Sequence, residues 1–262
     1  MQISELNRDD LSAIARLQPE GWQDITPSFR FYLSHSFCSP YKLTLGDEIA
    51  GVGATVRHAT TSWLGHIIVH PQHRNRGFGT LITNHLISIA KKDSTTISLI
   101  ATTLGAPVYA KCGFKTEREY IFLQGQALPA AAPASDYDTE FESQMLDLDR
   151  KISGEDRRQL LTPHLKNSKL VLSDKKVTGF YMPTLGEGLI VADNEEAGIR
   201  LLHEKLKASD NKIVIPLENQ TALSYLQKLG YKEFLRGTRM YLGNKILWHP
   251  NKLYSRIAGN LG

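Results

Sequence analysis

Apolar residues recur at two different spacings along the first half of the chain, and each spacing predicts one type of secondary structure. Clustered or alternating apolar positions predict strands at residues 41–45, 48–55, 62–70, 95–101 and 120–123. Helical spacing predicts a helix over Asp9–Leu17, which Asn7 or Asp9 can cap, and another over Phe78–Lys91. The second helix has a predicted apolar face, made of Phe78, Leu81, Ile82, Leu86 and Ile89, that can lie on a sheet. This mixture predicts a layered α/β (α+β) domain.

A break in composition divides the chain into two parts. Residues 125–138 read GQALPAAAPASDYD, where proline, alanine and small polar residues replace any apolar period. The alternation of strand-like and helix-like stretches resumes after this segment. We therefore expect an amino-terminal domain at residues 1–125, a linker at 126–139 and a carboxy-terminal domain at 140–262.

Two short segments suggest that the domains are related by duplication. The segment Pro107–Phe114 (PVYAKCGF) aligns with Ser224–Tyr231 (SYLQKLGY). Each follows a strand-like run and precedes a charged turn and another strand. Short matches arise by chance, but the matching neighbourhoods favour a duplication.

Composition narrows the class of protein. With 41% hydrophobic and 22% charged residues, the 262-residue chain has the balance of a globular protein rather than of a disordered or fibrous one. Its apolar runs fall short of the 18 residues of a membrane span, and its start is polar and acidic, so we expect a cytoplasmic protein without membrane association. Cys38 and Cys112 are too few for a disulfide framework, which favours reduced thiols but leaves one disulfide open. The net charge of +4 is scattered, so nucleic-acid binding is not expected, whereas an anionic small ligand is compatible.

The segment from Ser62 to Thr80 contains the most informative residues. An apolar strand ends near Val69, Pro71 stops the strand, and a turn containing arginines and glycines leads into the second helix. Unpaired amides and the positive end of the helix dipole favour an anion such as a pyrophosphate at this place. The turn lacks the Gly-Lys-Ser/Thr of a Walker loop, and Ile82 stands where a dinucleotide fingerprint has its third glycine.

These residues resemble the hallmark of the GNAT superfamily of acetyltransferases, Gln/Arg-x-x-Gly-x-Gly/Ala after a strand. The chain has Arg74-x-x-Gly77-x-Gly79, preceded by Val69-x-Pro71. The resemblance implies acetyl-coenzyme A as cosubstrate. It also implies two sets of cofactor-binding backbone groups: Ile67, Ile68 and Val69 for the pantetheine arm, and Arg74, Asn75, Arg76, Gly77, Phe78, Gly79 and Thr80 for the pyrophosphate. The alternative interpretation is an ordinary strand–turn–helix corner with surface arginines.

A second element, Leu104–Phe114, is similar to the Tyr-x-x-x-Gly-Phe signature of the same superfamily. The resemblance places at Tyr109 the acid that protonates the departing thiolate of coenzyme A, a role that a positioned phenol can fill. The alternative is a tyrosine that only packs under the sheet. Many relatives have an asparagine just after the preceding strand, where this chain has Ala101-Thr102-Thr103.

The base that accepts the proton of the attacking amine is less clearly specified. His66 lies on the strand before the glycine turn and has a suitable pKa range, although it can equally be packed or face solvent. His66, His70 and His73 could suggest a metal, but no carboxylate or cysteine near them in the sequence completes a set, so we expect no metal. Cys112 occupies an apolar helix position and is expected to be an inert thiol, which favours direct attack by the amine.

Residues from about 140 onward resemble the carboxy-terminal half of tandem GNAT proteins. The resemblance rests on Leu148-Asp149, Asp156-Arg157-Arg158, Asn219-x-x-Ala222, Gly230-Tyr231, Thr238-Arg239-Met240 and the tail Tyr254–Gly262. It implies two tandem GNAT-like domains, each with a mixed, largely antiparallel central sheet flanked by helices. Residues 188–198 contain acidic side chains and no Gly-x-Gly, and Leu226 aligns with Tyr109. We therefore expect a degenerate second copy that shapes the acceptor pocket or makes a dimer contact.

Together these features predict an N-acetyltransferase that transfers an acetyl group from acetyl-coenzyme A to a primary amine in a ternary complex. Trp22, after Glu20-Gly21, is a candidate substrate contact or a core residue. The acceptor can be a small molecule or a peptide, and the protein can be a monomer or a homodimer. The rival hypothesis is a sensor that binds an acyl-coenzyme A without catalysis.

Overall fold

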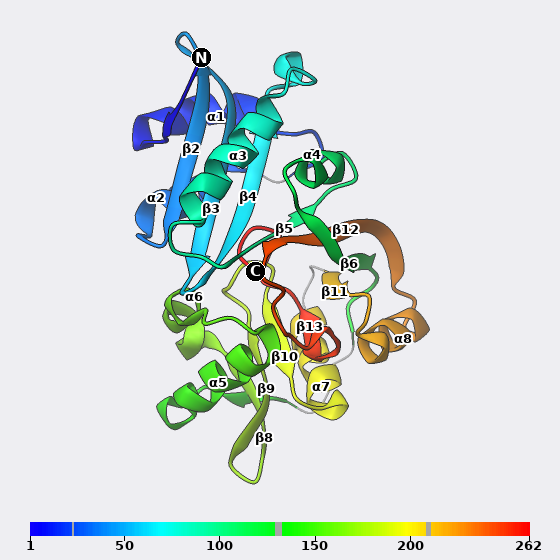
Figure 1. The fold of residues 1–262 in the computed structure, drawn as a ribbon. Coiled ribbons are helices and arrows are strands. Elements are labelled where there is room, and N and C mark those ends of the chain that lie inside the picture. Colours follow the sequence, from blue (N-terminus) through cyan, green and yellow to red (C-terminus); the bar gives the residue numbers. More distant parts are fainter. Residues whose placement is uncertain (23, 129–132, 208–210) are drawn as a thin grey trace. The chain divides into compact units, whose positions relative to one another are not determined.

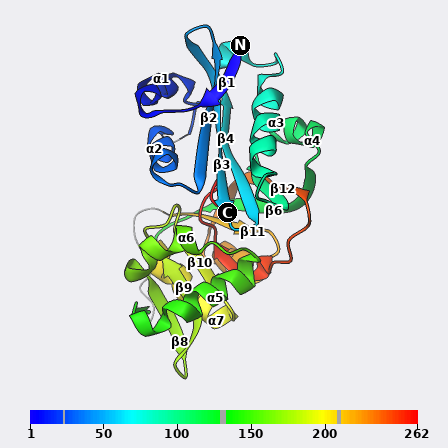
Figure 2. The same cartoon turned by 60° about the vertical axis from the view of Figure 1, so that its left-hand side comes forward.

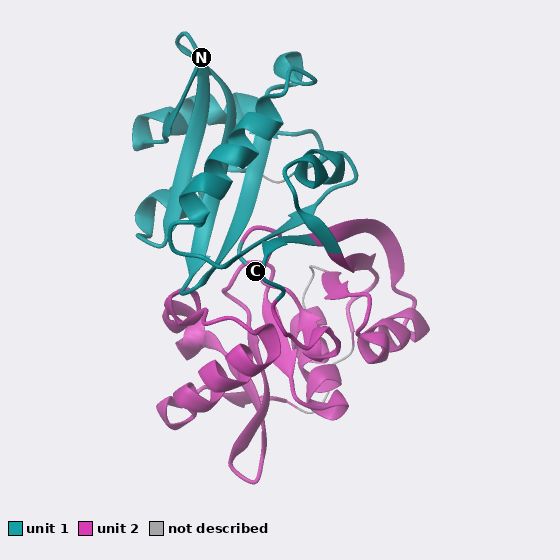
Figure 3. Cartoon of the chain, viewed as in Figure 1, with its two compact units in different colours: residues 1–116, 240–245, 261 teal, residues 117–239, 246–260, 262 magenta. Residues whose placement is uncertain are grey.

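The computed structural model describes residues 1–22, 24–128, 133–207 and 211–262. Contacts divide the chain into two compact units (Figure 3). Unit 1 comprises Met1–Thr116, Met240–Lys245 and Leu261; unit 2 comprises Glu117–Arg239, Ile246–Asn260 and Gly262. Strand β12 (Lys232–Gly243) supplies residues to both units. The units are thus not consecutive in sequence, and the division after Thr116 precedes the composition break on which the predicted domain boundaries rest.

The proline- and alanine-rich stretch is partly incorporated into unit 2. Leu128 is buried in the core of this unit. Farther along, β7 (Ser135–Asp136) pairs with β8 (Lys169–Ser173). Residues 129–132 of the predicted linker lie outside the described residues. Both ends of the stretch therefore have structural roles that its composition does not indicate.

Unit 1 is built on a mixed, mainly antiparallel sheet. Its strands are β1 (Gln2–Glu5), β2 (Cys38–Leu45), β3 (Glu48–His58), β4 (Thr61–Val69), β5 (Thr96–Ala101) and the last residues of β12, in the order β1-β2-β3-β4-β5-β12. Neighbouring strands from β1 to β4 are antiparallel, and β4 and β5 are parallel. Four of the predicted strands correspond to β2 to β5, and residues 120–123 fall within β6 (Lys115–Gln124). These predictions are confirmed.

Helices cover both faces of the unit 1 sheet (Figures 1 and 2). On one face lie α1 (Leu11–Ile14) and α2 (Thr26–Ser34), and on the other lies α3 (Phe78–Ala90), followed along the chain by α4 (Ala106–Lys111). The helix predicted over Asp9–Leu17 is helical throughout, but only Leu11–Ile14 is α-helical. A 3₁₀ turn at Arg8–Asp10, capped by Asn7, precedes α1, and a second one at Ala15–Leu17 follows it.

Helix α3 lies very close to the sheet because two glycines of β3 face it. A Cβ on Gly51 would be 2.7 Å from Ile82 Cδ1, and a Cβ on Gly53 would be 2.9 Å from Ile82 Cγ2. The predicted apolar face is correct for Phe78, Ile82 and Leu86, which are buried, but Leu81 is 40% exposed and Ile89 is only half-buried. Ile87 and Ala90 are buried in their place, so the contact face is rotated from the predicted one.

Unit 2 contains a five-stranded sheet in the order β13-β10-β9-β8-β7 and the strands β12, β6 and β11. The strands not yet located are β9 (Lys176–Met182), β10 (Leu189–Ala192), β11 (Lys212–Pro216) and β13 (Leu253–Ser255), and the helices are α5 (Glu142–Ser153), α6 (Arg158–Leu161), α7 (Glu195–Leu206) and α8 (Gln220–Lys228). The five-stranded sheet is antiparallel throughout. Among the helices that the structure describes, none is long and apolar enough to cross a membrane.

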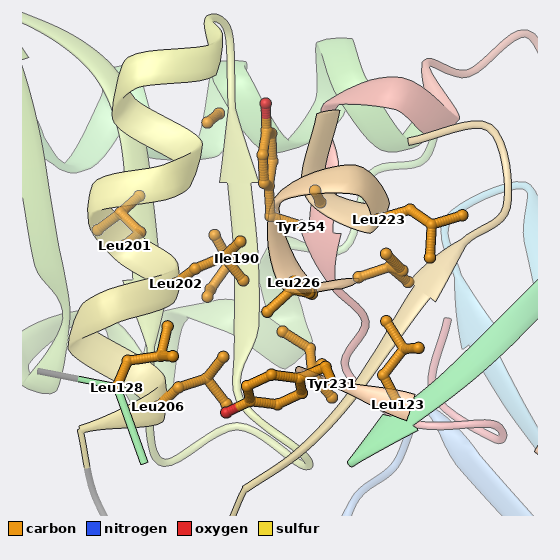
Figure 4. Close-up of a cluster of buried hydrophobic side chains, with 14 of the residues drawn as sticks. Leu123, Leu128, Ile190, Leu201, Leu202, Leu206, Leu223, Leu226, Tyr231 and Tyr254 are labelled. Atoms are coloured by element: carbon orange, nitrogen blue, oxygen red, sulfur yellow. The ribbon is translucent and has the colours of Figure 1, made fainter. Parts of the chain in front are cut away.

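The core of unit 2 lies between α7, α8 and the strands (Figure 4). Leu201 and Leu202 of α7 and Leu226 of α8 are fully buried with Ile190 of β10. Tyr254 packs against α7 at Gly198, where an added Cβ would be 2.1 Å from the tyrosine ring. The burial of these apolar side chains stabilises the unit.

A buried ion pair fixes the start of α6 against α5. Arg157 Nη2 donates to Asp149 Oδ1 at 2.5 Å and Arg157 Nε donates to Oδ2 at 3.1 Å, and both side chains are 3% exposed or less. Removing one partner leaves a buried charge without compensation. We expect Asp149→Ala to lower the free energy of unfolding by about 3–5 kcal/mol, measured by urea denaturation. Glu233→Ala, which breaks an exposed ion pair with Arg236, serves as the control and should change it by less than about 1 kcal/mol. Equal effects of the two substitutions would contradict this account.

Candidate active site

Strand β4 carries a bulge at His66. Val52 pairs with Ile68 and Ala54 pairs with Gly65, so Gly53 alone stands opposite two residues of β4. His66 is one of these two and has φ +51°, a left-handed conformation that histidine adopts more readily than most residues. The bulge shifts the alternation of side chains.

The shift separates His66 from the α3 side of the sheet. Leu64, Ile67 and Val69 all pack in the cluster beneath α3, whereas strict alternation would group residues 64, 66 and 68. His66 instead contacts the rings of Phe29 and Tyr32 on α2, with ring centroids 5.7 Å from its own in both cases.

The edge of β4 that faces β5 is open beyond its first residues. In residues 24–128, which are all described, the two strands pair only at Thr61–Trp63 with Thr96–Ser98. The backbone of Ile67, Ile68 and Val69 pairs on one side with β3 but has no strand partner toward β5. An extended ligand with amide groups could hydrogen-bond to this edge.

The open edge leads to an uncapped helix start. Gly77 precedes α3 with φ +81°, and no side chain caps the helix. The first helical bond runs from Leu81 N–H to the Gly77 carbonyl at 3.0 Å, so the amides of Phe78, Gly79 and Thr80 precede it. Such amides, with the helix dipole, favour an anion. The side chain of Phe78 is buried, so this residue can contribute only its backbone amide to anion binding.

Two exposed arginines flank this turn. Arg74 Nε donates to the Val69 carbonyl at 3.3 Å, which ties the turn to the end of β4. The Arg76 guanidinium lies 5.1 Å from the centroid of the Phe78 ring, and its Nη1 is 3.1 Å from His73 Nδ1. Both groups add positive charge next to the free amides. Asn75, between them, has φ +61°.

Tyr109 lies on α4 and is half-buried. A Cβ on Gly105 would be only 2.9 Å from its ring, so glycine allows the tyrosine to pack against the start of its own helix. Burial, and secondarily Cys112, raises the pKa of Tyr109 to about 12. The phenol is therefore protonated at neutral pH and can donate a hydrogen bond.

Two neighbours of Tyr109 have structural functions. Thr102 Oγ1, at the position where relatives have an asparagine, accepts from the Gly105 amide at 3.2 Å and so supports the start of α4. Cys112, predicted to be an inert thiol, is half-buried, and burial raises its pKa. A raised pKa lowers the thiolate fraction and hence the reactivity.

Trp22 and Tyr32 lie beside His66. Trp22 is 47% exposed and its ring centroid is 6.3 Å from that of His66, so Trp22 is no core residue in this structure. The Tyr32 hydroxyl is 2.6 Å from His66 Nδ1. Tyr32 belongs to no sequence motif described above, and the sequence did not predict it as a residue of the site.

A carboxylate does approach the histidine pair after β4, which corrects the sequence interpretation. Glu48, His70 and His73 have ligand atoms within 4.8 Å of one another, and His66 is not among them. Glu48 is remote in sequence and comes close because β3 and β4 are paired. The Nδ1 atoms already accept hydrogen bonds, from Gln72 N–H on His70 and from Arg76 on His73. A neutral ring in this state has its hydrogen on Nε2, which then cannot bind a metal. The metal-free site stays a prediction.

The structure of unit 2 supports the sequence repeat. In α4 the Phe114 amide donates to the Tyr109 carbonyl at 3.1 Å, and in α8 the Tyr231 amide donates to the Leu226 carbonyl at 3.0 Å. Gly113 and Gly230 both have positive φ at these helix ends, +91° and +84°. The two helix ends thus have the same hydrogen-bond pattern.

The candidate catalytic and coenzyme-binding features of unit 1 have no counterpart in the residues of unit 2 that the structure describes. Leu226 is fully buried where Tyr109 is half-buried. The start of α7 is capped by Asn194, whose side chain accepts from the Ala197 amide at 2.9 Å. A hollow between α7 and α8 is lined by Glu195 and Glu196 and also by Arg200. Acidic groups at this helix start disfavour a pyrophosphate, so we place no coenzyme there.

Unit 1 thus joins a bulged strand with an open edge to an uncapped helix start. Residues 40–116 and residues 145–255 each match a family model described as an acetyltransferase (GNAT) domain. The chain belongs to the GNAT acetyltransferase family and carries two such domains in tandem.

Individual relatives agree with this assignment. The uncharacterized N-acetyltransferase YitH of Bacillus subtilis (strain 168) is 28% identical over 117 residues, which are 44% of this chain and 41% of that protein. A candidate acetyltransferase from Pyrococcus horikoshii has a similar structure, with a TM-score of 0.86, 22% identity and coverage of 100% of this chain and 95% of that one. A tandem GNAT protein from the clavulanic acid biosynthesis pathway has a TM-score of 0.57 and 13% identity, covering 92% and 98%. At these identities the two structures show a shared fold alone.

Proposed function

We propose that unit 1 binds acetyl-coenzyme A along the open edge of β4 and transfers its acetyl group to a primary amine. The observation that carries the proposal is the continuity of two ligand-binding features: an unpaired strand edge that ends in an uncapped, glycine-preceded helix start. The edge suits the amides of a pantetheine arm, and the helix start with Arg74 and Arg76 suits a pyrophosphate.

In the proposed reaction the neutral amine attacks the thioester carbonyl directly. A C–N bond forms, the C–S bond breaks, and the amine loses one proton to His66 while the thiolate of coenzyme A departs. Tyr109 donates a hydrogen bond to this thiolate. Because its pKa of about 12 exceeds that of an ordinary thiol by about 3.5, complete proton transfer would be uphill by about 5 kcal/mol before the ligand changes the environment. Hydrogen bonding to the developing charge is the more favourable role.

The acceptor remains defined only by its chemistry. Trp22 is exposed beside His66 and is proposed to contact the acceptor, a small molecule or peptide with a primary amine. The contribution of unit 2 to the acceptor site, a monomeric or homodimeric state and a cytoplasmic location stay predictions.

The proposal is tested by calorimetric titration with acetyl-coenzyme A and coenzyme A, followed by a screen of primary amines with detection of released thiol. Binding with turnover of at least one amine supports an acetyltransferase. Binding without any turnover would favour the sensor hypothesis. Absence of binding would leave the glycine turn as an ordinary helix corner and overturn the proposal.

A further inference from the structure

Arg76 donates a hydrogen bond to a histidine ring in the turn before α3. Arg76 Nη1 lies 3.1 Å from His73 Nδ1. A guanidinium group has N–H donors and no acceptor, so Nδ1 has to supply the lone pair of this bond. A hydrogen on Nδ1 would instead face another N–H group. The contact therefore assigns the His73 ring: it is neutral, and its hydrogen is on Nε2.

The other ring nitrogen of His73 faces a carboxylate. His73 Nε2 is buried and lies 3.3 Å from Glu48 Oε2, at the start of β3. The described residues offer Nε2 no aligned hydrogen-bond acceptor, so Glu48 acts on the ring through its charge. A negative charge favours the tautomer whose hydrogen is on the nearer nitrogen. Arg76 and Glu48 thus favour the same tautomer from opposite sides of the ring.

Packing fixes the position of the His73 ring. His73 ends the 3₁₀ turn Pro71–His73, and its amide donates to the His70 carbonyl at 2.8 Å. The centroid of its ring is 5.6 Å from that of His70 and 6.2 Å from that of Phe78, and the side chain is 14% exposed. A ring held on several sides presents Nδ1 at a constant place.

The Arg76 guanidinium is anchored on two sides but keeps unused donors. It lies 5.1 Å from the centroid of the Phe78 ring, within the range of a cation–π interaction. His73 accepts from one of its five N–H groups. Among the residues that the structure describes, no carboxylate forms an ion pair with Arg76. Its charge and its remaining donors are therefore available to an anion beside the free amides of α3.

We infer that His73 is a positioning residue that holds the Arg76 guanidinium ready for the pyrophosphate of coenzyme A. The inference rests on the proposed function for the identity of the ligand, whereas the assignment of the His73 hydrogen does not. An arginine that is free in solution loses rotamer freedom when it binds an anion. His73 and Phe78 restrict Arg76 beforehand, so less of this freedom is lost on binding.

Calorimetric titration with coenzyme A tests the role of His73 in binding. His73→Ala removes the acceptor, and we expect the affinity to fall by about five-fold. His73→Asn restores an acceptor, because its side-chain oxygen is as many bonds from the backbone as Nδ1, and it should bind within about two-fold of the native protein. His35→Ala is the matched control, since His35 is also half-buried and stacks on Phe31 at the end of α2, and it should bind within about two-fold. An unchanged affinity in His73→Ala, or equal losses in His73→Ala and His73→Asn, overturns the inference.

A double-mutant cycle shows whether His73 acts through Arg76. In Arg76→Ala protein, adding His73→Ala should change the affinity by less than about two-fold. An undiminished loss in that background overturns the inference, because His73 would then act without Arg76. The cycle is repeated with dephospho-coenzyme A, which keeps the pyrophosphate and lacks the 3′-phosphate, and the same losses are expected. Losses confined to coenzyme A would place Arg76 at the 3′-phosphate and overturn the inferred contact.

The position of the ring hydrogen can be measured without any ligand. In the ¹⁵N-labelled full-length protein at pH 8, long-range ¹H–¹⁵N spectra distinguish protonated from unprotonated ring nitrogens, and His73→Asn identifies the signals of His73 among the nine histidines. We expect a protonated Nε2 and an unprotonated Nδ1. A dominant Nδ1–H tautomer overturns the inference alone. The expected tautomer in a native protein that binds no coenzyme A would overturn the proposed function, and with it the ligand that Arg76 is inferred to bind.

Discussion

Gly77→Glu is expected to weaken the binding of acetyl-coenzyme A by at least about 100-fold, which corresponds to about 2.7 kcal/mol. Two physical effects add at this position. Gly77 has φ +81°, a conformation that a side-chain-bearing residue adopts at a cost of about 1–2 kcal/mol. The carboxylate would also stand at the uncapped start of α3, where it competes with the pyrophosphate for the free amides. Calorimetric titration of native and variant protein measures the loss.

Two further variants separate strain from charge. Gly46→Glu is the matched control, since Gly46 also has positive φ, +58°, and no atom lies within 4 Å of an added Cβ at either glycine. It lies in the turn between β2 and β3, and it should leave the affinity within about two-fold. Gly77→Asn keeps a residue that tolerates the left-handed region without a charge and should retain most of the affinity. Equal affinities of native protein and Gly77→Glu would mean that the phosphates lie elsewhere.

The turn before α3 could be predicted from the sequence because its determinants are local. Pro71 ends the strand, Gly77 supplies the positive φ, and the apolar period after it predicts the helix. The same holds for the strands of unit 1. Local signals thus predict the strand end and helix start at which we propose that the coenzyme binds, and the ligand contacts stay predictions.

The surroundings of His66, where we propose that the acceptor binds, could not be predicted in the same way. Tyr32 and His66 are 34 residues apart in the sequence and meet only because a bulge turns His66 toward α2. The hydrophobic pattern of the sequence does not mark that bulge. The glycine that stands opposite it, Gly53 on β3, is the sequence feature associated with it. The approach of Glu48 to His70 and His73 likewise depends on strand pairing. Contacts between residues distant in sequence require the register of the sheet.

The limits of the two units differ from the predicted domain boundaries for a different reason. The predicted boundaries rest on the composition of a proline- and alanine-rich stretch. The limits of the units depend on which strands pair, and composition does not reveal this pairing. Strand β12 serves both units, and Leu128 within the supposed linker is buried. The repeat of α4 and α8, by contrast, was visible because a glycine with positive φ follows each helix at the same distance. Residues required by local backbone geometry are thus easier to recognise than residues required by long-range pairing.

Tyr109→Phe is expected to lower kcat by about 100-fold or more while the affinity for acetyl-coenzyme A stays within about two-fold. The substitution keeps the ring that packs on Gly105 and Phe114 and removes only the hydroxyl. Without it the departing thiolate lacks a donor in the transition state. Since the pKa of Tyr109 is about 12, the phenol stays protonated up to about pH 11, and no fall of activity below that pH should arise from its ionisation. Steady-state kinetics over pH 6–10 and calorimetry measure both quantities.

Tyr225→Phe in α8 is the control for the loss of a tyrosine hydroxyl at a helix of the same type. Tyr225 OH is 2.7 Å from His203 Nε2, so the variant loses a comparable polar contact in unit 2 and should leave kcat within about two-fold. A small effect of Tyr109→Phe, equal to that of Tyr225→Phe, would show that Tyr109 only packs and makes no catalytically useful hydrogen bond to the departing thiolate. A loss of affinity for acetyl-coenzyme A with an unchanged kcat would instead indicate that Tyr109 acts in binding. The reason is that losing an interaction made equally in the ground and transition states does not lower kcat.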